Sequence, residues 1–302
     1  MEGLVLLDKP AGITSFKAVA TVRFLSGEKR IGHTGTLDPM ATGVLPVLLG
    51  QATRLSNLLL NAEKRYTARL KLGVTTDTLD CTGQVLSTAP VTADSGALRR
   101  AVKGFVGEID QVPPMYSALK QNGRRLYDLA REGVEVIRPA RRVVIKSLDL
   151  LDQVGPDEYE MDVLCSKGTY IRSLVDDIGK TLGCGAVLTS LRRTMTAGFE
   201  IKDCVPLARL EAEGVPPFLL PADRAVEAFP KIMVTPAQGL RFCNGGGLSL
   251  ARLNLSVPPQ DGQLFRVYAP GGFLGMGEIR LKDEILAIRC IVGGRTVCLS
   301  MK

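Results

Sequence analysis

The chain has 302 residues, 45% of them hydrophobic and 23% charged, so it is long enough to bury a core and form about two domains. Its net charge of +7 and isoelectric point of about 9.1 suggest a polyanionic partner, although proteins that bind none also reach these values. No apolar run approaches the roughly 18 residues of a membrane span, and no basic signal region precedes the first strand, so we expect a cytoplasmic protein without a membrane partner.

The amino-terminal segment predicts a strand followed by a helix. The apolar run at residues 4–7 indicates a strand that stops at Lys9-Pro10-Ala11-Gly12, because proline and glycine end regular structure. A helix is expected next, with Ser15 as its cap and Gly27 at its end. The spacing of its large apolar side chains predicts its buried face. These side chains are Phe16, Val19, Ala20 and Phe24.

Residues 65–73 alternate between apolar and polar and predict a strand with Tyr66 on its apolar face. A basic helix is expected at residues 124–131. Its positive side chains either face RNA or form an ordinary solvated surface. Strands with helices between them indicate an α+β fold. The other elements expected here are a polar loop at 75–80, a strand at 84–86, a helix at 97–105, an extended break at 113–114, strands at 143–152 and 158–165, a helix at 169–182 and a strand at 187–193.

A boundary between two domains is expected near Pro216, Pro217 and Pro221. Beyond it, short strands among glycine and proline clusters predict a small β-rich domain over residues 231–302. This part holds nine Lys and Arg against four Asp and Glu, so it is more basic than the rest. We therefore expect a first domain at residues 1–230 and a second at 231–302.

Asp38 is the strongest candidate for a reactive carboxylate. The run from Gly32 to Gly43 surrounds it with three glycines, three threonines and Pro39, small or rigid residues that let a substrate backbone approach closely. An ordinary Asx turn at Asp38-Pro39 explains the same spacing. The spacing alone does not separate these two interpretations.

Other chemistries find little support. His33 is the only histidine, and both an acid–base and a structural role remain open for it. A catalytic serine elbow, a phosphate loop and a dinucleotide fingerprint are all absent. The seven cysteines form no Cys-x-x-Cys pair, so a transition-metal site would need carboxylates almost alone. We expect no metal and no cofactor. Tyr170 and Arg172 lie at the start of an expected helix. Their side chains either contact a substrate there or only pack at the protein surface.

Eight motifs occur in an order that resembles one enzyme family. They are Asp8-Lys9-Pro10-Ala11-Gly12, Gly32-His33-Thr34-Gly35-Thr36-Leu37-Asp38-Pro39, Ala41-Thr42-Gly43-Val44-Leu45-Pro46, Lys64-Arg65-Tyr66, Thr76-Asp77-Thr78-Leu79-Asp80, Pro113-Pro114-Met115-Tyr116-Ser117-Ala118-Leu119-Lys120, Arg125-Leu126-Tyr127 and Gly168-Thr169-Tyr170-Ile171-Arg172. The chain is similar to the TruB family, enzymes that convert uridine 55 in the T-loop of tRNA to pseudouridine. Met40 and Leu79 depart from the family pattern without removing a functional group.

The resemblance implies a mixed, largely antiparallel sheet core of the pseudouridine synthase type, with a PUA-like RNA-binding domain after residue 231. It implies that Asp38 attacks the target nucleotide, at the sugar C1′ or the base C6, without metal or cofactor. It implies further site residues, each matched to a family position. These are His33, which fills the space left by the flipped base, Tyr66, which stacks on that base, Tyr170 and Leu191, which line its pocket, Arg172, which pairs with Asp38, and Asp80 and Lys9, which support the site.

The resemblance implies the T-arm of tRNA as the partner. We expect a monomer, although the sequence leaves the oligomeric state open, and the charge of a basic segment at about residues 99–142 predicts that it faces the RNA. An RNA-binding module that has lost its chemistry is an alternative, and the intact Asp38 argues against it. A small-molecule glycosidase is another, with Asp80 as a second carboxylate. Net charge and the pairing of Arg172 with Asp38 favour RNA over a sugar substrate.

Overall fold

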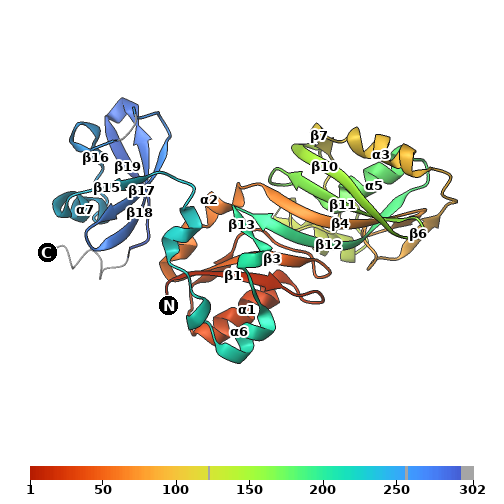
Figure 1. The fold of residues 1–302 in the computed structure, drawn as a ribbon, viewed down its shortest axis with the longest axis horizontal. Coiled ribbons are helices and arrows are strands. Elements are labelled where there is room, and N and C mark those ends of the chain that lie inside the picture. The colour runs from red at the N-terminus through yellow and green to blue at the C-terminus, as the bar shows by residue number, and fades with distance from the viewer. Residues whose placement is uncertain (122, 256–257, 294–302) are drawn as a thin grey trace.

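The computed structural model describes residues 1–121, 123–255 and 258–293, in which two large sheets follow each other along the chain (Figure 1) and two two-stranded sheets accompany them. The larger sheet has ten strands. They are β1 (Gly3–Lys9), β2 (Ile31–His33), β3 (Thr42–Leu49), β4 (Lys64–Leu72), β7 (Gly107–Gln111), β10 (Arg141–Gly155), β11 (Glu158–Cys165), β12 (Ala186–Thr196), β13 (Phe199–Glu200) and β14 (Val205–Pro206).

Eight of these strands lie in the order β14-β1-β3-β12-β4-β11-β10-β7, while β13 pairs with β12 and β2 with β3. The pairs β1–β14 and β3–β12 are parallel, and the other neighbours are antiparallel. The expected α+β fold with a largely antiparallel sheet is therefore confirmed. Strands β3, β12 and β4, which are distant in sequence, are adjacent at the centre of this sheet.

Helices pack against both faces of the larger sheet, because alternate residues of β3 contact the helix at residues 15–26 on one face and the helix at residues 56–60 on the other. Those expected from sequence at residues 97–105 and 169–182 are confirmed with slightly shifted ends, and Leu98 and Leu174 pack from them into one core cluster with β4 and β11. A second cluster joins the first helix to β1 and β3. The helices are α1 (Ser15–Ser26), α2 (Ser56–Leu60), α3 (Ser95–Lys103), α4 (Leu126–Arg131), α5 (Ile171–Thr181), α6 (Leu207–Glu213) and α7 (Pro236–Cys243).

Strand β4 has the alternation that its sequence predicts. Its buried positions are every second residue, and Tyr66 and Leu70 lie on the side that faces α5 and the core. The alternate positions are polar, and Arg65 and Arg69 pair there with carboxylates of β11 on the exposed side. This alternation fixes which face of the sheet Tyr66 presents.

Helix α1 corrects two expectations. Its cap is Thr14, not Ser15, because the Thr14 hydroxyl accepts a hydrogen bond from the Lys17 amide at 3.0 Å. The expected apolar face is confirmed only at Val19, since Phe16 and Phe24 are 80% and 86% exposed. The helix packs through a face of smaller side chains instead, which lets it lie close to the sheet. That face consists of Ser15, Ala18, Val19 and Val22.

Two segments, an expected loop and the start of an expected helix, differ from the sequence expectation. Residues 75–80 are not all loop, because β5 (Val74–Thr76) forms a hairpin with β6 (Val85–Thr88), the strand that was expected nearby. The basic helix begins at Leu126 rather than at residue 124, since β9 (Arg124–Arg125) pairs with β8 (Lys120–Gln121). In both places two short strands pair as a hairpin where the sequence predicted a loop or a helix.

The second sheet contains the short strands expected beyond residue 231, in the order β15-β17-β18-β19-β16. Met276 of this sheet and the nearby Val292 belong to a core cluster that also contains Leu4 and Leu48 of the larger sheet. Among the described residues, none of the helices is long and apolar enough to cross a bilayer. The strands are β15 (Lys231–Met233), β16 (Leu248–Ser249), β17 (Leu264–Ala269), β18 (Gly272–Arg280) and β19 (Ile285–Ile291).

Candidate active site

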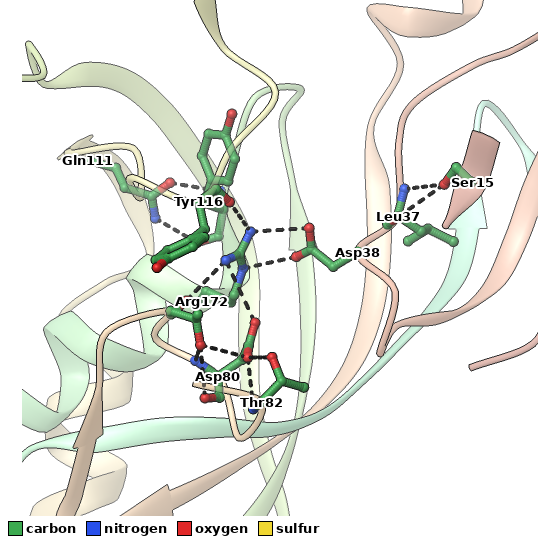
Figure 2. Close-up of polar contacts among 10 residues, drawn as sticks. Ser15, Leu37, Asp38, Asp80, Thr82, Gln111, Tyr116 and Arg172 are labelled. Atoms are coloured by element: carbon green, nitrogen blue, oxygen red, sulfur yellow. Dashed lines mark hydrogen bonds and ion pairs between the residues drawn. The ribbon is translucent and has the colours of Figure 1, made fainter. Parts of the chain in front are cut away.

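Asp38 lies in the turn between β2 and β3, partly open to solvent, with 34% of its side chain exposed. Both of its carboxylate oxygens accept hydrogen bonds or ion-pair contacts from Arg172 of α5 (Figure 2). Within the described residues, no backbone N–H of the turn donates to this carboxylate, as an Asx turn would require. The side chain is therefore directed across the site and not into its own turn.

Two neighbouring segments bond to the backbone of the Asp38 turn. The buried Ser15 hydroxyl accepts from the Leu37 amide at 2.8 Å and donates to the Leu37 carbonyl at 3.0 Å (Figure 2). On the other side of Asp38, the Pro39 carbonyl accepts from the Gly12 amide at 2.8 Å and from Lys9 Nζ at 3.4 Å. These contacts fix the backbone immediately before and after the carboxylate.

Replacing Ser15 by alanine tests this support. We expect Ser15→Ala to lower the free energy of unfolding by about 1–3 kcal/mol, because the buried Leu37 amide and carbonyl lose their shared partner. Denaturant unfolding measures the change. Ser190→Ala, on the exposed side of β12, is the control and should stay within about 0.5 kcal/mol of the parent. Equal stability of the two variants would refute this role for Ser15.

Arg172 connects three segments through one buried guanidinium. Its Nε lies 2.9 Å from Asp38 Oδ2 and its Nη2 lies 3.1 Å from Asp38 Oδ1, a two-pronged contact that suits arginine better than lysine. Nη2 also donates to the Tyr116 carbonyl at 2.8 Å, and Nη1 donates to the Thr78 carbonyl at 3.0 Å. Only 5% of the Arg172 side chain is exposed, so these protein contacts define its position.

Asp80 is a second acidic neighbour of Arg172, with Oδ2 lying 3.7 Å from Nη1. Its Oδ1 accepts from the Thr78 hydroxyl at 2.8 Å and from the Thr82 amide at 3.0 Å (Figure 2). Leu79 between them has a φ of 63°, which is rare for a branched side chain and turns the chain sharply. The turn thus orients Asp80 and brings the Thr78 carbonyl to the guanidinium.

Burial and charge act in opposite directions on Asp38. Burial raises the pKa of the Asp38 carboxyl, and the Asp80 carboxylate adds to this, while Arg172 lowers the pKa by charge and by hydrogen bonding. The net shift is upward. Arg172 favours the ionised form as expected from sequence, but desolvation outweighs it.

This raised pKa predicts the acidic limb of the pH–rate profile. If ionised Asp38 is the reactive group, the single-turnover rate falls as the pH drops, because protonation removes the attacking charge. The midpoint should lie above the ordinary aspartate range, since the folded pKa is raised. Rapid-quench assays give the rate, and circular dichroism at each pH reports whether the protein stays folded. A rate that stays constant down to the ordinary aspartate range would contradict this expectation.

Lys9 and His33 flank the turn. Lys9 is fully buried, and its ammonium group donates to the Pro10 and Ile13 carbonyls at 2.7 Å each. Burial lowers the pKa of Lys9 to about 8, although Asp38 opposes the change. Burial also lowers the pKa of His33, and the charge of Arg193 adds to this effect, which favours a neutral imidazole. A neutral His33 suits a space-filling role.

Tyr66, Tyr170 and Leu191 come from β4, the start of α5 and β12. Tyr66 is 6% exposed and Leu191 7%, and both belong to one core cluster with Leu37, the residue before Asp38. Burial raises the pKa of the Tyr66 and Tyr170 hydroxyls, which favours their protonated form. The position of Tyr170 is fixed by Gln111, whose side-chain amide bonds to its backbone N–H and C=O at 2.8 and 3.0 Å (Figure 2).

Several supporting residues were not identified as such from the sequence. Ser15 was interpreted as a helix cap, and Tyr116 and Thr78 act through backbone carbonyls, which no sequence motif reveals. Gln111 and Arg193 carried no recognisable spacing signal. Among the described residues, no group of three or more His, Cys, Asp or Glu side chains is placed to hold a metal ion.

Comparison with known proteins gives consistent matches over most of the chain. Residues 23–171 match the N-terminal domain of the TruB family of pseudouridylate synthases, and residues 172–227 match the tRNA pseudouridylate synthase B C-terminal domain. A protein of Aromatoleum aromaticum named tRNA pseudouridine synthase B is 47% identical over 281 residues, which cover 92% of this chain and 89% of that protein. One of Vibrio cholerae with the same name is 44% identical and covers 97% of each chain.

Solved structures agree with these matches. A Cbf5-Nop10-Gar1 complex contains a chain that superposes with a TM-score of 0.73 at 26% identity, covering 98% of this chain and 86% of that one. An H/ACA RNP bound to a substrate RNA containing 2′-deoxyuridine gives a TM-score of 0.74 at 24% identity, with the same coverage. The second likeness concerns the fold alone.

Proposed function

Because the chain belongs to the TruB family of pseudouridylate synthases, we propose that it isomerises uridine 55 in the T-loop of tRNA to pseudouridine. The family identity makes it a tRNA pseudouridine synthase, an isomerase that acts by intramolecular transfer. The choice of uridine 55 and the reaction at Asp38 are the further steps of this proposal. The reaction at Asp38 is argued from the residues around this carboxylate, and the choice of uridine 55 is argued from the resemblance of the sequence motifs to the family.

The two-pronged contact between Arg172 and Asp38 is the observation that carries the mechanism. A nucleophilic carboxylate must be reachable by substrate, ionised and aimed, and Asp38 is partly exposed while its partner guanidinium is buried. The cation lowers the pKa of Asp38 against the effect of burial, so part of the carboxylate's desolvation is offset before RNA arrives. A preformed ion pair also costs little reorganisation when the substrate binds.

The reaction is an isomerisation, so its atoms balance without an added reagent. The N1–C1′ bond of the target uridine breaks, the detached uracil rotates, and a C5–C1′ bond forms. C5 loses its proton and N1 gains one, while Asp38 attacks the nucleotide and is released at the end. No oxidant, reductant or metal ion enters this balance.

The remaining site residues serve base flipping, which costs a few kcal/mol because the target base leaves its stack. In this proposal His33 fills the vacated space in the RNA. Tyr66 stacks on the flipped uracil, which is worth about 1–3 kcal/mol by analogy with single-strand binders. Tyr170 and Leu191 complete the pocket wall, and Asp80 and Lys9 support Arg172 and the Asp38 turn.

RNA binding extends beyond this pocket. We propose that residues 1–230 are the catalytic domain, with a basic segment at about 99–142 facing the T-arm. Residues 231–302 form a PUA-like domain that binds RNA, supported by their excess of positive charge and their five-stranded sheet. The protein acts as a monomer in the cytoplasm, where this substrate is found.

Tritium release tests the function directly. With tRNA that carries tritium at uridine C5, the protein should release tritium to water, because C5 loses its hydrogen when it bonds to C1′. A matched tRNA with cytidine at position 55 and tritium in its remaining uridines is the control and should release none. Release from both tRNAs would contradict the proposed site, and release from neither would contradict the reaction.

A further inference from the structure

Arg193 is a fully buried arginine at the centre of the larger sheet, with no exposed surface. It lies directly opposite Tyr66 in the β12–β4 pairing and opposite Gly43 in the β12–β3 pairing. Residues that face each other across neighbouring strands share a side of the sheet, so Arg193 is on the active-site side with Tyr66. It also stands two residues beyond Leu191 on the same face.

The Arg193 guanidinium bonds to the chain on both sides of Asp38. Its Nη2 donates to the Gly35 carbonyl at 3.0 Å, and its Nε donates to the Val44 carbonyl at 2.7 Å. Gly35 precedes Asp38 by three residues and Val44 follows it by six. One side chain from a central strand therefore holds the two ends of the segment that carries the carboxylate.

This position is costly for a charged group. Arg193 Nη1 is buried without a well-formed hydrogen bond among the described residues, and the guanidinium interacts with the Tyr66 hydroxyl closely enough to lower its pKa against the effect of burial. Burial lowers the pKa of Lys64 to about 8 and also lowers the pKa of His33, and the positive charge of Arg193 adds to both shifts. A core leucine or methionine would avoid both penalties, since buried charges rarely stabilise a fold more than apolar residues do. A stabilising role alone thus explains Arg193 poorly.

The backbone around Asp38 lies close to Arg193 at two glycines, which also indicates that Arg193 positions this segment. Gly35 has a φ of +87°, and a Cβ there would meet Arg193 Nη1 at 3.4 Å and Lys64 Cε at 3.5 Å. At Gly43, near the start of β3, a Cβ would lie 2.2 Å from the Arg193 carbonyl oxygen. The backbone thus passes Arg193 at close range before and after Asp38, and only glycine fits these conformations without strain.

We infer that Arg193 is a positioning residue of the reaction, which clamps the Gly35 and Val44 carbonyls and so holds Asp38 toward the substrate. This inference rests on the proposed function and adds a residue to it that touches neither the carboxylate nor the solvent. Arginine is required because one planar fork reaches two carbonyls, whereas the single ammonium group of lysine reaches one.

Arg193→Lys tests the clamp with its charge preserved. We expect the single-turnover rate of tritium release to fall about 100-fold, the effect of a displacement of about 1 Å at a reacting group. The dissociation constant for tRNA should stay within about threefold, because Arg193 is not exposed. Arg192→Lys is the matched control on the same strand. Arg192 is 40% exposed and pairs with Asp8 and Thr42, so its substitution should leave the rate unchanged.

A second variant keeps the test decisive if Arg193→Lys does not fold. Gly35→Ala leaves Arg193 in place but strains the carbonyl that it holds, and it should slow the reaction to a similar extent. Where both single variants fold, the double variant should be no slower than the slower single one, because each breaks the same clamp. Losses that multiply would overturn the inference.

The outcomes separate this inference from the proposed function. An inactive parent protein would remove the function and the inference together. An active parent with an equally active Arg193→Lys variant would overturn the inference alone. A loss that appears only as weaker tRNA binding, with an unchanged single-turnover rate at saturation, would also overturn it.

Discussion

Asp38→Asn is expected to lower the single-turnover rate of tritium release by about 10⁴- to 10⁶-fold, the range found when a reacting or directly assisting group is removed from an enzyme. Asparagine has nearly the same shape, so the turn held by Ser15 and Lys9 should persist. Its amide carries no negative charge and cannot attack the nucleotide. The loss should therefore appear in the rate of chemistry and not in the fold.

Two measurements make this expectation specific. Binding of tRNA by Asp38→Asn should remain within a few-fold of the parent, because most of the affinity comes from phosphate contacts elsewhere. Asp162→Asn removes a different carboxylate, in a surface ion pair with Arg65, and should leave the rate unchanged. An Asp38→Asn variant that retains the parent rate would end the assignment of Asp38 as the nucleophile.

Arg172→Lys is expected to slow the reaction by about 10²- to 10³-fold, the usual cost of losing a preorganised donor at a reacting group. Lysine keeps the positive charge but cannot contact both Asp38 oxygens and two carbonyls at once. The half-buried Thr78 and Tyr116 carbonyls also lose a donor, which destabilises the fold by up to about 1–3 kcal/mol for a carbonyl that no water reaches. Both the rate and the stability should therefore fall.

The matched control is Arg65→Lys on the exposed side of β4. Arg65 also pairs with an aspartate, at 2.7 Å, but 53% of its side chain is exposed. Its replacement should change the free energy of unfolding by less than about 1 kcal/mol and leave the rate intact. Stopped-flow or rapid-quench assays and denaturant unfolding measure the two effects. A similar loss in both lysine variants would show that any arginine-to-lysine change harms this fold.

Local sequence predicted most of the elements because their signals are short-range. The alternation in β4, the ends of β1 and the extent of α5 depend on side chains within a few residues of one another. Helix α1 shows the limit of this approach. Its two phenylalanines have the spacing of a buried face, yet the helix packs through Ala18 and Val22. Which face is buried depends on the surface that the helix meets.

The candidate site likewise contains residues that sequence motifs identify and residues that only the structure reveals. Asp38 and Arg172 were identified as individual residues, through motifs that can be recognised one at a time. The side chains of Ser15 and Arg193 bond to backbone atoms of the Asp38 segment, and the Tyr116 backbone carbonyl bonds to Arg172. In each case the two partners are distant in sequence, so these contacts leave no local pattern. The sequence predicted the chemical groups but not the contacts that orient them.

The sequence by itself therefore determined the α+β class, most element positions and the family, and it made Asp38 the candidate carboxylate. The tertiary structure decided that Arg172, 134 residues away, meets both oxygens of that carboxylate, and that burial raises its pKa although a cation is present. The physical reason is that desolvation and ion pairing act through space. Both depend on which strands and helices pack around a group, and this becomes defined only when β3, β12 and α5 come together.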